Sequence, residues 1–398
     1  VYIVHAVDTE GPLYESTKAT IERLNATFGI KLEPTHENLV KLRNKEIVLD
    51  GIEDEVSKFL DPALQNYNDT WDKIEKMHER ILSDEFRFAN PDSFGNGWIY
   101  NWFCMDHVGY EYNPRHRDMG YHNIYDRYLE ILDKYGRYKD DVQFHFHPMS
   151  HYKEANRAGK SYEHSKTLYQ ILSRRIIDRE FFPAAFRAGC VTERPDANWF
   201  LEQWIPFDCS NFAVEDHNKE MHKDQKNGQA GDWRRAPHDW SVYHPDIYDY
   251  QVPGLCHRSI GRFLNIVSRY GNITEAEVEK AFKRANDGIP TLLGMFNHDF
   301  RDMGKEAEYV QSILQPIAKK YPDVKFKYSR VKDAFNAVLG QEEQPLELDI
   351  KLDGENLEVH CTKGKVFGPQ PYLAVKTKDG RYFHDNFDFG MDGNSWYY

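Results

Sequence analysis

Short apolar runs with the two-residue alternation of β-strands recur along the chain, separated by segments whose apolar residues follow helical spacing. The predicted strands are Val1–Val7, Gly97–Met105, Asp141–His147, Ala184–Arg187, Pro206–Cys209, Thr291–Asn297 and Lys325–Tyr328. The predicted helices between them include Ile124–Lys134, Ser165–Arg179, Thr274–Arg284 and Glu306–Lys320. Strands that alternate with helices indicate a parallel sheet. Six or seven such units in about 340 residues predict an α/β class fold, a closed or distorted barrel.

Two regions depart from this pattern. Residues 12–90 follow the first strand as a long, charged insertion with helical segments at Asp54–Leu60 and Asp72–Leu82. The insertion could cover the mouth of the barrel or mediate self-association into a homo-oligomer, and the sequence leaves both open.

The second departure is the tail, residues 344–398, where strand-like alternation returns without intervening helices. The turn signals Asp353-Gly354 and Asp379-Gly380 separate its predicted strands. These strands are Pro345–Lys351, Asn356–Cys361, Tyr372–Lys378 and Tyr382–Phe387. We therefore predict a barrel domain over residues 1–340 and a small antiparallel β unit over residues 344–398.

Composition narrows the function classes. The chain has 398 residues, with 51 Lys and Arg against 64 Asp and Glu, which gives a formal net charge of −13. An acidic chain without a basic cluster argues against nucleic acid or an anionic membrane as the main partner. No run approaches the roughly 18 apolar residues of a membrane span. Five widely spaced cysteines without a C-x-x-C motif fit a reducing compartment, so we expect a cytoplasmic protein.

Acidic and imidazole side chains gather at two predicted strand ends. Asp8 and Glu10 close the first strand, and residues two apart on a strand point to the same side. His145 and His147 close the third, with His151 four residues further on. Solvated surface acids are the plain alternative for Asp8 and Glu10. Two imidazoles with one carboxylate leave positions open for water and substrate, which is typical of a catalytic zinc site.

Two further strand ends carry candidate chemistry. Arg187 follows a buried strand and could hold a carboxylate by a charge-assisted bond. His298 ends the run Gly294–Asn297 and could act as a proton donor, with Asp299 or a more distant acid setting its tautomer. A structural role is the alternative for each.

Minor candidates for substrate contact lie at other strand ends and in loops. Asp106 and Asp208 each follow a strand-like run, and both could equally be structural. Trp240, together with Trp233 and Tyr243, lies in a loop that could form a hydrophobic substrate pocket. His116 and His122 lie in a charged loop, where a solvated surface position is expected.

These elements, in this order, resemble the motifs of the polysaccharide deacetylase superfamily, carbohydrate esterase family four. The resemblance covers roughly residues 1–340 and implies a distorted (β/α)7 barrel with a divalent metal, usually Zn²⁺. It implies that Asp8 and Glu10 supply the base and a metal ligand, that two histidines complete the ligands, that Arg187 orients the base and that His298 is the acid. The D-x-E-G and H-x-H-P forms resemble a branch from bacterial O-antigen and surface-polysaccharide clusters.

This chain also departs from the family pattern. Thr9 separates the two acids, which are adjacent in the family, so the roles of Asp8 and Glu10 could be exchanged. The family's four-residue spacing selects His147 and His151, whereas strand alternation selects His145 and His147, the pairing that we prefer because Pro148 ends the strand. The proline that the third motif usually carries is absent.

The resemblance implies metal-dependent removal of an acetyl or formyl group from the nitrogen of an amino sugar. A chain without a secretion signal further suggests a nucleotide- or lipid-linked precursor as substrate. Three alternatives remain at this point: hydrolysis of another linear or cyclic amide on the same fold, a carbohydrate-binding barrel without activity, and an iron oxygenase with the same ligand set. The last usually occurs on all-β folds, against which the βα alternation argues.

Overall fold

The computed structural model describes residues 1–398 except 152, 156, 158, 160 and 216–229. Its centre is a ring of seven parallel strands in which each strand pairs with the next and β7 closes onto β1. The strands are β1 (Tyr2–Thr9), β2 (Tyr100–Cys104), β3 (Asp141–Phe146), β4 (Ala185–Ala188), β5 (Phe207–Asn211), β6 (Ser259–Asn265) and β7 (Leu292–His298). The predicted α/β barrel is therefore confirmed.

One strand of the ring escaped prediction. β6 carries Gly261 and Arg262 in its middle, and this interrupts the apolar pattern by which buried strands are recognised. Arg262 is nevertheless 1% exposed, because its guanidinium pairs with Glu277 and lies over the Trp240 ring. The strand predicted at Lys325–Tyr328 is only β8 (Lys327–Tyr328), a two-residue strand outside the ring that pairs with the start of β1.

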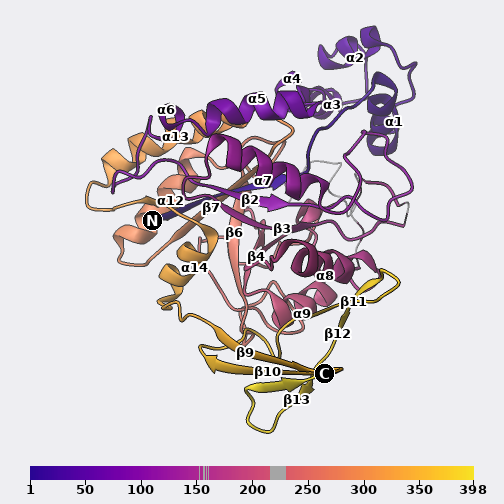
Figure 1. Cartoon of the computed structure of the whole chain (residues 1–398). Helices are drawn as coiled ribbons and strands as arrows, with labels where there is room; N and C mark the ends of the chain where they lie inside the picture. The colour runs from indigo at the N-terminus through magenta and orange to yellow at the C-terminus, as the bar shows by residue number, and fades with distance from the viewer. Residues whose placement is uncertain (152, 156, 158, 160, 216–229) are drawn as a thin grey trace.

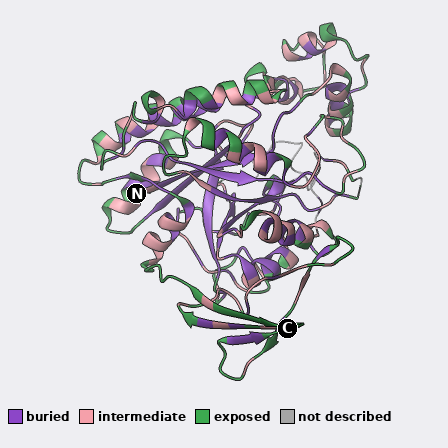
Figure 2. Cartoon of the chain, viewed as in Figure 1, coloured by how far each residue is buried: buried purple, intermediate pink, exposed green. Residues whose placement is uncertain are grey.

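Helices cover the outside of the ring (Figure 1). The helices that follow the ring strands are α7 (Asn123–Tyr135), α8 (Thr167–Arg179), α9 (Pro195–Trp204), α12 (Glu275–Asn286) and α13 (Met303–Lys320), with α14 (Val331–Leu339) after β8. Figure 2 shows the ring strands almost wholly buried, whereas the helices bury one side and expose the other. This division follows from parallel strands being covered on both faces. No helix in the described ranges is long and apolar enough to cross a membrane.

The insertion between β1 and β2 is helical, as expected. Its helices are α1 (Thr17–Phe28), α2 (His36–Arg43), α3 (Glu53–Phe59), α4 (Pro62–Gln65), α5 (Trp71–Ile81) and α6 (Asp84–Arg87). The first three share a small apolar core of their own. Asn68, between α4 and α5, donates its side-chain amide to the carbonyls of Asp299 and Arg301, at 3.0 and 3.1 Å. The insertion is thereby fastened to the chain just beyond β7, at the carboxyl end of the barrel.

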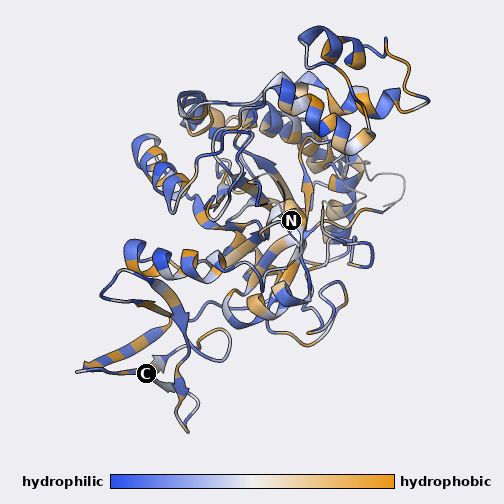
Figure 3. Cartoon of the chain, turned by 90° about the vertical axis from the view of Figure 1, so that its right-hand side faces the viewer, coloured by the Kyte–Doolittle hydropathy of each residue, from blue (hydrophilic) through white to orange (hydrophobic). Residues whose placement is uncertain are grey.

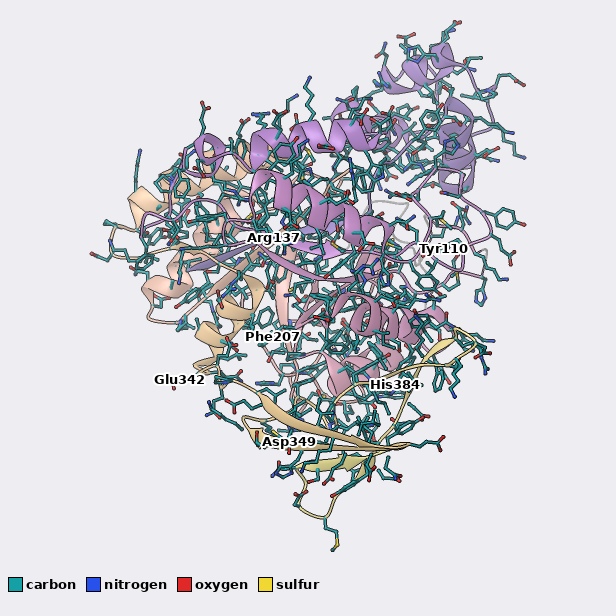
Figure 4. The ribbon with its side chains drawn as sticks, in the orientation of Figure 1. Tyr110, Arg137, Phe207, Glu342, Asp349 and His384 are labelled. Carbon is teal, nitrogen blue, oxygen red and sulfur yellow. The ribbon has the colours of Figure 1, made fainter. Side chains whose placement is uncertain are left out.

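The tail forms two small antiparallel sheets. One has the order β13-β14-β10-β9, and the other is the β11–β12 hairpin. Their strands are β9 (Glu347–Asp353), β10 (Asn356–Lys363), β11 (Leu373–Lys376), β12 (Tyr382–Asp385), β13 (Asp388–Phe389) and β14 (Ser395–Tyr397). Stripes of alternating hydropathy along these strands are visible in Figure 3. Figure 4 places Asp349 in the lower sheet and His384 beside the barrel, where its ring lies 4.9 Å from that of Trp204.

Candidate metal centre

Strand pairing brings the predicted catalytic residues together at the carboxyl end of the barrel. Asp8 on β1 lies opposite His298 on β7, and His145 on β3 lies opposite Arg187 on β4. The chain turns directly after β1 at Gly11, whose φ of 71° is in the left-handed region that favours glycine. This turn carries Glu10 over the same end of the ring, so residues from opposite ends of the barrel sequence share one buried site.

Three side chains form a group that can hold a metal ion. One ligand atom each of Glu10, His145 and His147 lies within 4.8 Å of the other two, and all three residues are buried. Glu10 Oε1 is 3.7 Å from His145 Nε2 and 3.5 Å from His147 Nε2. His145 and His147 are the histidine pair expected from strand alternation. Glu10 is one of the two acids that could serve as the third ligand.

The donor chemistry of these atoms fits a divalent cation. His145 Nδ1 lies 3.0 Å from the carbonyl oxygen of Arg187, to which it can only donate, so its Nε2 carries the lone pair. That nitrogen faces His147 Nε2 at 3.0 Å, beside a carboxylate oxygen. Two converging imidazole nitrogens and a carboxylate suit zinc, and a backbone carbonyl that fixes the tautomer, as for His145, is the usual support of a histidine ligand.

Both carboxylate oxygens of Asp8 are bound by Arg187. Its Nε and Nη2 donate to the two oxygens of Asp8 at 2.6 and 3.0 Å, and Nη1 donates to the carbonyl of Cys209. Burial acts to raise the pKa of Asp8, but the adjacent guanidinium outweighs it and lowers that pKa below its ordinary value. Asp8 is therefore an ionised carboxylate fixed in orientation beside the group of metal ligands.

Arg117 plays the corresponding part for Glu10, and no sequence pattern points to it. Its Nη2 donates to Glu10 Oε2 at 2.5 Å, which leaves Oε1 directed at the histidines. Burial again acts to raise the pKa of Glu10, and Arg117 is the strongest of the effects that lower it well below the usual range. Arg117 belongs to a loop of alternating charged residues after β2, a pattern typical of solvent-exposed surface, yet it is only 6% exposed.

His298 lies at the more open side of the site. Its Nε2 is 3.8 Å from Asp8 Oδ2 and 3.7 Å from Glu10 Oε1. The side chain is 22% exposed, against 3% for Asp8 and 6% for Glu10 and His147. Burial lowers the pKa of His298 to about 3, so the imidazole is neutral at ordinary pH. A neutral imidazole first takes up a proton and can then donate it.

The expectation that Asp299 sets the tautomer of His298 is wrong. Asp299 instead accepts from the backbone N–H groups of Glu10 and Gly11, at 3.1 and 2.8 Å, and from the Tyr128 hydroxyl at 2.9 Å. His298 Nδ1 is buried and has no hydrogen-bond partner within the described ranges. Asp299 therefore fixes the turn that carries Glu10, because its carboxylate satisfies the amides that the turn leaves free.

Other predicted site residues lie apart from this group. His151 is exposed in the turn after β3. The polar atoms of the three proposed substrate-contact residues have partners in the protein: Asp106 pairs with Arg175, Asp208 with Arg258, and Trp240 donates to the carbonyl of Glu277. All three are buried, which favours structural roles; substrate contact for them remains a prediction.

Three residues from predicted loops are buried, and a surface position was expected for one of them. His122 is 4% exposed and its backbone N–H donates to Asp106, so the surface position predicted for it is wrong. Its neighbour in that prediction, His116, is exposed. Trp233 and Tyr243 are 2% and 6% exposed, and both donate to backbone carbonyls. Their rings belong to the packed core, and a role in a substrate pocket remains a prediction for them.

Comparison with known proteins adds little. No family model matches the sequence, and no curated protein does. One similar solved structure is a crystal structure from Parabacteroides distasonis, provisionally assigned as a glycoside hydrolase/deacetylase. It shares 9% sequence identity with this chain at a TM-score of 0.40, over 96% of this chain and 83% of the other. So distant a likeness carries no weight in assigning a function to this chain.

Proposed function

We propose that this protein is a metal-dependent hydrolase that removes an N-acyl group, acetyl or formyl, from an amino sugar. The observation that carries the proposal is the convergence of Glu10, His145 and His147 next to two further functional groups, the Asp8–Arg187 pair and His298. A group of ligands alone would suit storage or structure. Ligands beside an oriented carboxylate and a neutral imidazole suit proton transfer during hydrolysis.

Glu10, His145 and His147 would hold the cation, with zinc favoured by the ligand types. When bound, the cation supplies Lewis-acid polarisation of the acyl carbonyl and lowers the pKa of a water molecule. Arg117 keeps one oxygen of Glu10 directed at the cation site. Arg187 keeps Asp8 ionised, so that Asp8 can accept a proton from the attacking water.

His298 then delivers a proton to the departing nitrogen, because an amide nitrogen leaves readily only as a neutral amine. The low pKa of His298 means that it must first acquire this proton. Asp8 Oδ2, 3.8 Å from His298 Nε2, is the adjacent group from which the proton can pass. The two residues would thus act in sequence on one proton.

A separate cavity, which none of the ligand or acid–base residues line, could take a part of the substrate beyond the acyl group. A space of about 640 Å³ lies between the insertion and the segment after β7, within the range of small-molecule pockets. Arg43, Gln65 and Asn66 line it on one side, and Arg301 and Lys305 on the other. Side chains that donate and accept hydrogen bonds suit sugar hydroxyls. On the motif resemblance, we propose a precursor of a bacterial surface polysaccharide.

The test is release of an amine from a panel of N-acetylated and N-formylated amino sugars, presented free, nucleotide-linked and as oligosaccharides. Mass spectrometry should detect loss of one acyl group with metal-loaded protein, none after chelation, and recovery when zinc is restored. Full turnover by a metal-free sample would refute the proposal. Turnover of a cyclic ureide and of no sugar amide would favour the other amide hydrolase, and 2-oxoglutarate consumption with bound iron would favour the oxygenase.

A further inference from the structure

The two candidate histidine ligands are supported in different ways. The ring of His145 is fixed by the hydrogen bond from its Nδ1 to the Arg187 carbonyl. Nδ1 of His147 is buried and has no hydrogen-bond partner in the part of the chain that the structure describes. A ring without that bond is free to rotate about its side-chain torsions unless packing prevents it. Apart from the contacts of its Nε2 with His145 and Glu10, the orientation of His147 is set by what its ring packs against.

Gly189 is what the His147 ring packs against. A Cβ atom at position 189 would lie 2.1 Å from Cδ2 and 2.3 Å from Cγ of His147, so the backbone of Gly189 is pressed against the imidazole. The position of this backbone decides where the ring can lie. A small shift of the Gly189 backbone would therefore change the position of the His147 imidazole.

The turn that contains Gly189 is strained. Cys190 and Val191, which follow it, both adopt left-handed backbone conformations, with φ of 51° and 47°. A β-branched residue such as Val191 rarely adopts this conformation. Such a backbone persists only when its surroundings hold it in place.

Two residues of a distant segment hold the turn. The backbone N–H of Gly231 donates to the Cys190 carbonyl at 3.0 Å, and the Trp233 indole N–H donates to the Val191 carbonyl at 2.8 Å. A Cβ at position 231 would lie 1.7 Å from the Val191 oxygen, so glycine is required for this approach. Trp233 is 2% exposed, and its hydrogen bond is shielded from competing water.

We infer that Trp233 is a positioning residue for the metal centre: its indole N–H holds the strained Gly189–Val191 turn against the ring of His147. The inference deepens the proposed function, since it rests on His147 being a ligand. It assigns to Trp233 a role in ligand orientation rather than in a substrate pocket. Support of this kind typically changes metal affinity by about 10- to 100-fold when it is removed.

The test replaces the indole donor with a ring that cannot donate, Trp233→Phe, and measures zinc affinity by competition with a chromophoric chelator. We expect affinity to fall about 10-fold or more. The visible absorption of the Co²⁺-substituted protein should change as well, because it reports ligand geometry. A merely structural loss would lower thermal stability without altering that spectrum.

Trp396→Phe is the matched control. Trp396 is 3% exposed, and its indole also donates to a backbone carbonyl, that of Pro369 at 3.1 Å, but in the tail sheet. It should leave zinc affinity and the Co²⁺ spectrum unchanged. Unaltered zinc affinity and an unaltered spectrum in Trp233→Phe would overturn the inference, and so would a wild-type protein that binds no zinc. Zinc binding that depends on Trp233, in a protein that deacylates nothing, would uphold the inference while refuting the proposed function.

Discussion

Two of the clusters of buried charge in the described part of the barrel are built differently. The mouth cluster consists of two carboxylates, each with its own arginine, and three imidazoles: Asp8, Glu10, Arg117, Arg187, His145, His147 and His298. The Arg258 cluster consists of one arginine shared by two carboxylates and an amide: Arg258, Glu193, Asp208 and Asn198. Both are almost inaccessible to solvent apart from His298.

The two clusters differ in the direction of the polar atoms that could bind a further group. In the Arg258 cluster, the three guanidinium nitrogens donate to Asn198, Asp208 and Glu193, so all three point at protein partners within the cluster. In the mouth cluster, each arginine binds a carboxylate on the side away from the site, and the potential ligand atoms of Glu10, His145 and His147 face one another. Buried charge alone therefore does not indicate a functional site. A convergent group of potential metal ligands does.

The largest expected effect is on turnover, which should depend on the mouth cluster. His298→Ala should lower kcat by about 10²- to 10⁴-fold, because the departing nitrogen loses its proton donor. Zinc content should stay at the wild-type level, since His298 is outside the group of three ligands. Turnover and metal content of the same preparation check this. Loss of both together would instead make His298 a ligand.

The next effect is on the free energy of unfolding, which should depend on the Arg258 cluster. Arg258→Met should destabilise the fold by about 3–5 kcal/mol, because the buried Asp208 loses its counter-charge and Glu193 loses a hydrogen-bond donor. Urea unfolding monitored by tryptophan fluorescence measures the change. The folded fraction should bind zinc with wild-type affinity. Reduced zinc affinity in the folded protein would show that the two clusters are coupled.

The clusters should also respond to pH with opposite sign. Burial raises the pKa of Glu193 well above its ordinary value, so the folded state holds a proton that the unfolded state releases above about pH 4.5. Stability from this group is present at low pH and falls as pH rises, by at most about 1.4 kcal/mol per pH unit. The pKa values of Asp8 and Glu10 are lowered, so their contribution is lost only on acidification.

Glu193→Gln isolates the first of these responses. The variant cannot titrate at this position, so its stability should decline less than that of the wild type between about pH 5 and about pH 8. Urea unfolding of both proteins across this interval checks the difference. Parallel curves for variant and wild type would contradict the raised pKa.

The smallest effect concerns the support behind the mouth cluster. Tyr128→Phe removes one of the three donors to Asp299 and leaves the two backbone amides in place. A loss of about 1–3 kcal/mol in stability is expected for a hydrogen bond to a buried carboxyl group. Thermal unfolding measures it. A loss of zinc affinity in addition would mean that Asp299 controls the position of Glu10 more tightly than the backbone bonds suggest.

The fold was predictable where hydrophobic pattern and burial agree. Six of the seven ring strands are apolar runs flanked by turn residues, whereas β6 was missed because Arg262 is buried against Glu277 and Trp240, which only the folded chain brings together. In the candidate site, Asp8, Glu10, His145, Arg187 and His298 could be singled out because they end strands. Arg117 could not, since it reaches Glu10 from an irregular loop 107 residues away.

The pairing of β1 with β7 determines how a deletion in β1 would affect the site. Seven successive residues of β1, from Tyr2 to Asp8, align with seven residues of β7. Deleting one residue from this stretch would reverse the side on which every later side chain of the strand emerges. Asp8 would leave Arg187 and His298 at the same step at which Glu10 left the histidines. A one-residue deletion in β1 would therefore displace the proposed base, Asp8, and the proposed ligand, Glu10, together.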